Sequence, residues 1–184
     1  MRLIRTRLAV LATVLATVLM PGLSTAASAE AGTAPAPLPP RVTLSTGGGN
    51  VVNIDGRVFA ALLPTPVATR FRVLPAPGGV RFRDESTGGL VYAPDNEPFT
   101  QLRVSEPRWV PENSVFVIEG VASAESDLTP DGPGDVIRLA RIRLAGTDQY
   151  IGRHFVEDRS LLPKRVLLLP SGVHAPLFVI RPVF

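Results

Sequence analysis

Apolar residues along most of this chain recur at every second position, or in short runs that turn-forming residues separate. In residues 70–73 (RFRV) and 141–144 (RIRL), arginines alternate with apolar residues, which is the period of a strand with one buried face. The pattern predicts twelve short strands, at 41–44, 51–54, 57–63, 70–74, 80–83, 90–93, 100–106, 115–121, 135–144, 150–156, 164–170 and 177–183. Such spacing is typical of an all-β sandwich or barrel.

Internal similarity narrows the choice of fold. Three pairs of similar segments occur: 45–48 with 86–89, 85–86 with 125–126, and 69–73 with 100–104. Each pair is weak alone, but together they indicate a repeat of about forty residues. Twelve strands in three repeats predict a β-trefoil, in which three four-strand units close a barrel with a hairpin cap. An immunoglobulin-like or jelly-roll sandwich stays open, without the Cys–Trp–Cys arrangement of immunoglobulin domains.

The first 29 residues have the three parts of a secretory signal peptide. Arginines at positions 2, 5 and 7 precede an uncharged apolar run, 8–20, and residues 27–29 (ASA) form a small-x-small cleavage site. The apolar run is shorter than the ~20 helical residues that cross a bilayer, so no stable membrane anchor is expected after cleavage. Residues 30–40 read as a Pro/Ala-rich linker and 41–184 as the folded domain. We therefore expect a secreted, extracellular protein.

Charge and cysteine content then exclude several classes of function. The chain has 19 Lys and Arg against 16 Asp and Glu, and three of the arginines belong to the predicted signal peptide. The mature chain, residues 30–184, is therefore formally neutral, which disfavours binding to nucleic acid or to anionic membranes. Without cysteine there is no disulfide, no zinc-thiolate site and no cysteine nucleophile. We expect a disulfide-free monomer.

Catalytic and metal-binding patterns are also missing. The two histidines, His154 and His174, belong to no G-x-S-x-G or H-E-x-x-H motif and are interpreted as surface or turn residues. The acidic residues of loop 127–135 fail the calcium-binding pattern, since Arg138 stands where the bidentate Glu is needed. We therefore predict that the protein is not an enzyme and has no metal site and no cofactor.

Residues 150–180 are the most distinctive part of the sequence. They contain Ile-Gly-Arg at 151–153, Glu-Asp-Arg-Ser-Leu-Leu-Pro-Lys at 157–164 and Leu-Leu-Leu-Pro at 167–170, followed by a terminal apolar strand. This pattern resembles the mushroom-type (cospin-like) β-trefoil serine protease inhibitors. One departure is its position, because in the fungal proteins the motif lies near the start of the chain and here it lies in the last repeat.

The resemblance implies inhibition of an extracellular serine protease, trypsin-like or subtilisin-like, by an exposed loop that mimics substrate. In the fungal proteins the reactive basic residue lies between the second and third strands of a repeat. The matching loop here is 157–163, with Arg159 as the reactive residue and Ser160 after the scissile-like bond. The full set of candidate loop residues is Glu157, Asp158, Arg159, Ser160, Pro163 and Lys164, with Lys164 as a second basic candidate.

Three alternatives remain open at this point. The 157–163 segment is structural if its charged residues pair within a tight turn and Leu161 and Leu162 anchor it to the barrel. The reactive surface is otherwise another loop, such as 94–98 or 125–134. The protein is instead a carbohydrate- or cell-wall-binding β-trefoil if aromatic side chains around Trp109 or Tyr92 are exposed, although the nearest match to a lectin Q-x-W element, at 101–103 (QLR), lacks the tryptophan.

Overall fold

Twelve β-strands make up nearly all of the regular structure in the computed structural model, which describes residues 38–62, 67–125, 136–154 and 162–184, with the backbone only at 121–125, 136 and 137. The strands are β1 Arg41–Thr46, β2 Gly49–Ile54, β3 Arg57–Ala61, β4 Phe71–Ala76, β5 Gly79–Asp84, β6 Val91–Tyr92, β7 Arg103–Val104, β8 Phe116–Glu125, β9 Val136–Leu144, β10 Ile151–Arg153, β11 Lys164–Leu168 and β12 Phe178–Pro182. Each corresponds to one predicted strand. One short 3₁₀ turn, Glu112–Ser114, accompanies them. The predicted signal peptide, and the linker up to residue 37, lie outside the described residues.

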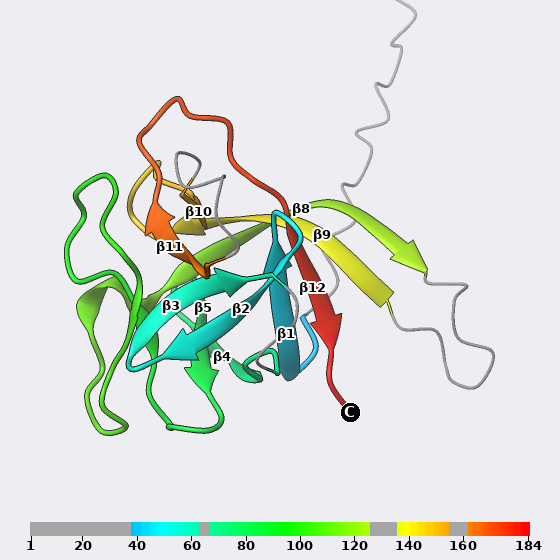
Figure 1. Cartoon of the computed structure of the whole chain (residues 1–184), viewed down its shortest axis with the longest axis horizontal. Coiled ribbons are helices and arrows are strands. Elements are labelled where there is room, and N and C mark those ends of the chain that lie inside the picture. Colours follow the sequence, from blue (N-terminus) through cyan, green and yellow to red (C-terminus); the bar gives the residue numbers. More distant parts are fainter. Residues whose placement is uncertain (1–37, 63–66, 126–135, 155–161) are drawn as a thin grey trace, which may run out of the picture. The chain divides into compact units, whose positions relative to one another are not determined.

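Six of the strands form a closed barrel. β1 pairs with β4, β4 with β5, β5 with β8, β8 with β9, β9 with β12, and β12 again with β1, all antiparallel. Figure 1 shows the first and last of these, β1 and β12, side by side. Closure leaves no unpaired barrel edge, and edges are the part of a sheet that invites aggregation.

The barrel interior is filled by large apolar side chains that alternate inward along the strands. Phe71, Phe82 and Phe116 are fully buried. The ring of Phe82 contacts that of Phe71 edge-to-face and that of Phe116 at a tilt, with centroids 6.2 Å and 5.9 Å apart. The outward-facing neighbours of Phe71, Phe82 and Ile142 are arginines, as the RFR and RIR patterns predict. Fully burying one such aromatic ring stabilises the fold by about 1.5–3 kcal/mol relative to exposure.

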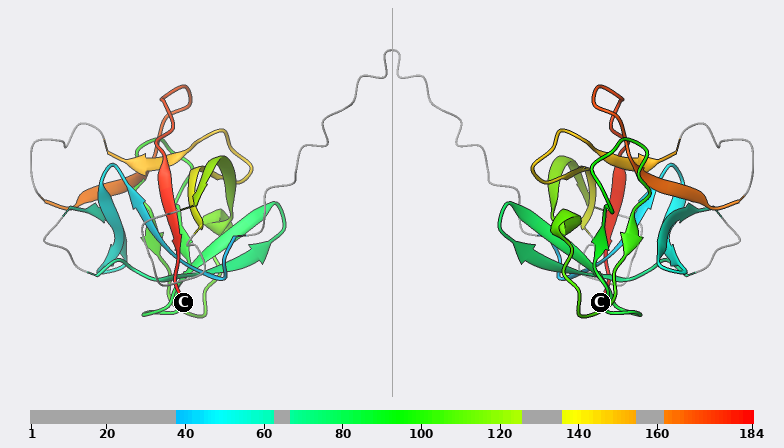
Figure 2. Two further views of the ribbon diagram at one scale, coloured as in Figure 1. Left: turned by 90° about the vertical axis from the view of Figure 1, so that its right-hand side faces the viewer. Right: turned by 90° about the vertical axis from the view of Figure 1, so that its left-hand side faces the viewer.

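The other six strands form three hairpins, β2–β3, β6–β7 and β10–β11. The hairpins contact one another, because β3 pairs with both β11 and β7, and Gln101 bridges to Leu167. The views in Figure 2, turned by 90° from Figure 1, show the same barrel and hairpins from two sides. A six-stranded barrel with three mutually paired hairpins is the β-trefoil that the repeats predict.

The structure also explains which internal similarities mark the repeat. β1, β5 and β9 are the first strands of the three units, and a glycine with positive φ follows each in a turn, at Gly47, Gly88 and Gly146. Segments 45–48 and 86–89 are therefore equivalent turns. The likeness of 69–73 to 100–104 relates the fourth strand of one unit to the third of the next, so it is not a structural equivalence.

Candidate functional site

The candidate loop joins β10 to β11, the second and third strands of the third repeat. The stem of this hairpin is fully paired, with Ile151 opposite Leu168 and Arg153 opposite Val166. One further hydrogen bond closes the stem, from His154 N to Arg165 O at 3.0 Å. Glu157, Asp158, Arg159 and Ser160 lie outside the described residues. The stem therefore holds the two ends of the loop at hydrogen-bonding separation.

Packing accounts for the Ile-Gly-Arg part of the motif. Ile151 is buried. A Cβ on Gly152 would lie 2.3 Å from Pro176 Cγ and 2.8 Å from Leu169 Cδ1, so only glycine fits without a shift of these neighbours. Arg153 donates from Nη1 to Gly47 O at 2.8 Å and so ties β10 to the turn between β1 and β2. These three residues hold the hairpin in place.

The described end of the loop separates two of the candidate residues. Pro163 is exposed, beside Leu162 at 70% exposure. Lys164 is only 1% exposed and lies opposite Ala60 of β3. A side chain buried between two cap hairpins is not presented to a protease, so this burial argues against Lys164 as the second basic candidate. The expectation that Leu162 anchors the loop in apolar surface is wrong, because its side chain faces solvent.

The equivalent connection in the second repeat lies beside this stem. Phe99 N donates to Leu168 O at 2.7 Å, and Leu168 N donates to Thr100 O at 2.9 Å, so the β6–β7 connection runs along β11. Asp95 Oδ1 accepts from Glu97 N at 3.0 Å and from the Thr100 hydroxyl. The Thr100 hydroxyl and the Glu97 amide lower the pKa of the Asp95 carboxyl. The connection is thus ordered by its own side chains while its residues 94–99 are exposed.

A polar cluster joins the start of β10 to the barrel. The Tyr150 hydroxyl donates to Glu119 Oε2 at 2.6 Å, and Arg143 Nε donates to Glu119 Oε1 at 2.9 Å. The Tyr150 hydroxyl and the Arg143 guanidinium together lower the pKa of the Glu119 carboxyl. The hydrogen bond to Glu119 raises the pKa of Tyr150. The Glu119 carboxylate therefore stays ionised at neutral pH. It holds Tyr150, the residue just before β10, against the barrel.

Two aromatic residues form the other conspicuous surface. Trp109 is 52% exposed, and its ring lies edge-to-face on Tyr92 with the centroids 5.1 Å apart. Ser105 Oγ donates to Trp109 O at 3.1 Å, which fixes the turn that carries the indole. Phe99, 46% exposed, lies 5.9 Å from the His154 ring.

No group of three His, Cys, Asp or Glu side chains able to hold a metal occurs within the described ranges. The acidic residues of loop 127–135 fall outside those ranges. His174 is exposed, as expected of a surface residue, and lies just after the turn at 171–172. The described residues also contain no helix long and apolar enough to span a membrane.

Comparison with known proteins bears on both the hairpin and the fold. A family model, Peptidase inhibitor I66, matches residues 140–183. That range begins in β9 and includes β10, the candidate loop, β11 and β12. The resemblance to the mushroom-type inhibitors is confirmed. No curated protein sequence matches the chain.

Two solved structures share the architecture of the whole domain. A proteinase inhibitor from Coprinopsis cinerea aligns over 79% of this chain and 98% of its own, with a TM-score of 0.51 and 12% identity. ThreeFoil, a designed 3-fold symmetric protein, aligns over 78% of this chain and 99% of its own, with a TM-score of 0.54 and 12% identity. At such identity the likeness shows the fold alone. The chain is a β-trefoil.

Proposed function

We propose that this protein is a secreted inhibitor of serine proteases that acts through the loop between β10 and β11. The observation that carries the proposal is the match of residues 140–183 to a peptidase inhibitor family, because that range contains both strands of the hairpin and the whole loop. The Coprinopsis cinerea inhibitor, a protein of the same fold, adds support. Both comparisons support inhibition of proteases in general. The restriction to serine proteases is the more specific part of the proposal.

Arg159 is the residue that we assign to the protease. Its guanidinium would fill an acidic specificity pocket of a trypsin-like enzyme, where a carboxylate accepts two parallel hydrogen bonds from the planar group. Ser160 would follow the bond that lies over the catalytic serine. Glu157, Asp158 and Pro163 would limit the conformations of the loop.

The stem supplies the rigidity that such a mechanism needs. An inhibitory loop binds tightly when it is held in its bound shape beforehand, because little conformational entropy is then lost on association. The hydrogen bond from His154 to Arg165 and the close packing of Gly152 hold the loop ends. The protein works without a cofactor and without a reaction of its own, as a monomer in the extracellular space where the predicted signal peptide would deliver it.

A protease panel tests this function. Purified protein is expected to inhibit a trypsin-like or subtilisin-like enzyme at stoichiometric concentration, measured as residual hydrolysis of a chromogenic peptide. Cysteine, aspartic and metalloproteases in the same panel show whether the effect is confined to the serine class. A panel in which no protease slows would remove the inhibitor proposal, and inhibition of cysteine proteases alone would move the target class.

Carbohydrate binding is a second candidate that one observation favours. The Trp109–Tyr92 pair presents the kind of exposed aromatic surface on which sugar rings stack. This function predicts that the protein sediments with an insoluble polysaccharide such as chitin or cellulose, and that Trp109→Ala abolishes the effect. If Trp109→Ala sediments as well as the unaltered protein, this surface is not a sugar site.

A further inference from the structure

Three arginines lie directly opposite one another on three neighbouring strands of the barrel. Arg41 of β1 is in register with Arg72 of β4, and Arg72 is in register with Arg83 of β5. Residues directly opposite in a ladder share one face of the sheet, with Cβ atoms about 5 Å apart. Like charges in these positions repel, so the row is destabilising unless anionic groups lie against it.

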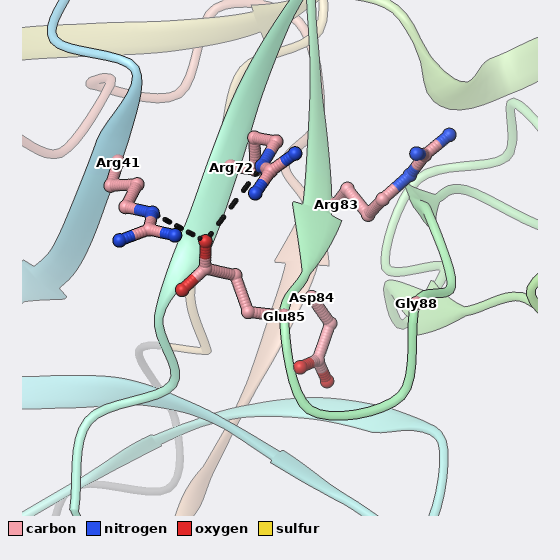
Figure 3. A pocket seen from close by; sticks show the side chains of 6 residues that line it. All are labelled: Arg41, Arg72, Arg83, Asp84, Glu85 and Gly88. Atoms are coloured by element: carbon pink, nitrogen blue, oxygen red, sulfur yellow. Dashed lines mark ion pairs between the residues drawn. The ribbon is translucent and has the colours of Figure 1, made fainter.

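A surface pocket of about 320 Å³ opens at this row. Arg41, Arg72, Arg83, Asp84, Glu85 and Gly88 line it. Glu85 Oε1 lies 2.9 Å from Arg41 Nε and 3.8 Å from Arg72 Nε. Figure 3 shows the Glu85 carboxylate between these two guanidinium groups, with the Arg83 guanidinium turned away from it. One carboxylate therefore compensates two arginines, and the third is left over.

The other carboxylate in the pocket lining is engaged elsewhere. Asp84 is fully buried and accepts hydrogen bonds from Ser86 N at 2.8 Å, from Ser86 Oγ at 2.6 Å and from Asn53 Nδ2 at 2.7 Å. Burial raises the pKa of Asp84, but these hydrogen bonds outweigh it, so the net pKa is below its usual value. Its role is to fix the turn after β5. Figure 3 shows its carboxylate directed away from the guanidinium groups.

The third arginine of the row, Arg83, has an unsatisfied donor. Its Nε is buried without a hydrogen-bond acceptor among the described residues. A buried donor that stays unsatisfied costs about 1–3 kcal/mol, more when it is charged. Residues two apart on a strand share a face of the sheet, so Arg70 lies on the same face as Arg72 and Arg81 on the same face as Arg83. These two arginines add to the positive potential of that face. The face is thus strongly basic, although the predicted mature chain is formally neutral.

We propose that the pocket over β1, β4 and β5 binds the phosphate or sulfate group of an anionic ligand, held between Arg72 and Arg83. Guanidinium groups bind such oxyanions through paired, charge-assisted hydrogen bonds. The pocket volume leaves room for the group and for the first atoms of whatever carries it. The site belongs to the barrel wall and uses no residue of the β10–β11 loop, so it goes beyond the inhibitor proposal and stands without it.

The test is a titration with inorganic phosphate and inorganic sulfate at constant ionic strength, followed by amide chemical shifts. Saturable shifts are expected at residues 72, 83 and 85–88. Arg83→Gln should weaken binding about tenfold, the effect of one charge-assisted hydrogen bond. Glu85→Gln should tighten it about threefold, because a competing carboxylate is removed. Arg108→Gln, at an exposed arginine outside the pocket, is the matched control and should change nothing.

A second arm separates the two sources of such a group. Dextran sulfate that binds more tightly than inorganic sulfate, with the same dependence on Arg83 and Glu85, would indicate a polymer-borne group, whereas equal affinities would indicate a free ion. The proposal is overturned if neither ion produces a saturable shift. It is equally overturned if Arg108→Gln weakens binding as much as Arg83→Gln, because the attraction is then diffuse surface charge.

Discussion

The β2–β3 and β10–β11 hairpins are built alike at the stem and differently at the tip. Both are second and third strands of a repeat, and both are paired in the cap. β2–β3 closes with two residues, Asp55 and Gly56, both with positive φ, which is the tight turn that matches strand twist. β10–β11 closes instead through residues 154–163. The paired stem is common to both repeats, and the tip is where the two repeats differ.

Under the proposed function, this difference separates the part of a hairpin that stabilises the fold from the part that binds. The two-residue turn presents a single side chain, that of the exposed Asp55, so β2–β3 offers little surface to a partner. The longer connection adds residues at little thermodynamic cost, because loop-closure entropy rises slowly with loop length. Substitutions in the β10–β11 stem should therefore act on folding, and substitutions at its tip on binding alone.

The largest expected effect on stability is at the β10–β11 stem. Gly152→Ala places a Cβ 2.3 Å from the Pro176 ring and should destabilise the protein by about 2 kcal/mol. Chemical denaturation measures the change. Gly120→Ala is the matched control, because a Cβ there meets nothing within 4 Å. Equal midpoints for the two variants would contradict the account of the Ile-Gly-Arg motif.

The β2–β3 turn should show a smaller effect with a different cause. At Gly56 a Cβ meets no atom closer than 3.7 Å, but φ is +75°, so Gly56→Ala should cost about 1 kcal/mol in backbone strain alone. Asp55→Asn should be nearly neutral, since asparagine tolerates the same conformation. Thermal unfolding checks both, and inhibition by the folded fraction should be unchanged. A loss of inhibition in Gly56→Ala would show that the two hairpins are not functionally separate.

The smallest effect on stability is expected at the connection of β6–β7, the third of the cap hairpins. The pKa of Asp95 is lowered by the Thr100 hydroxyl and the Glu97 amide. Because the pKa of Asp95 is lower in the folded state, this carboxyl stabilises the fold at pH values above its unfolded pKa of 3.8. The stabilisation is lost as the pH falls through the lower, folded-state pKa. Asp95→Ala should cost at most about 1 kcal/mol at pH 7, because the group is exposed.

Carboxyl chemical shifts across an acid titration give the measurement for Asp95. The midpoint for this residue should lie below 3.8, and the Glu97 amide should shift with it. A Thr100→Val variant removes the hydroxyl and should move the midpoint upward. A midpoint at or above 3.8 in the unaltered protein would show that this connection is not held by its own carboxylate.

Local patterning made most of the fold predictable. Alternation of arginine with Phe71, Phe82 or Ile142 located barrel strands, and the Gly-rich turns after β1 and β5 marked the repeat. The 45–48 and 86–89 likeness was informative because both turns need left-handed glycines. The 69–73 and 100–104 likeness misled, since any strand with one buried face shows such alternation whatever its place in the repeat.

The site was less accessible to sequence reasoning. The Ile-Gly-Arg motif indicated how the β10–β11 stem packs, but the burial of Lys164 depends on the neighbouring hairpin and carries no local signal. Leu162 is an apolar residue of the kind that anchors a loop, yet its side chain is exposed. The arginine row across β1, β4 and β5 also went unpredicted, because strand pairing between distant segments brings it together.

One measurement tests directly whether the β10–β11 tip carries the function. A trypsin-like protease is titrated with the unaltered protein, with Arg159→Glu and with Arg108→Glu as a charge-matched control, after denaturation midpoints have been compared. We predict that the unaltered protein and Arg108→Glu abolish activity near one equivalent, while Arg159→Glu leaves the protease fully active at an unchanged midpoint. Full inhibition by Arg159→Glu would contradict the assignment and place the reactive surface elsewhere on the trefoil.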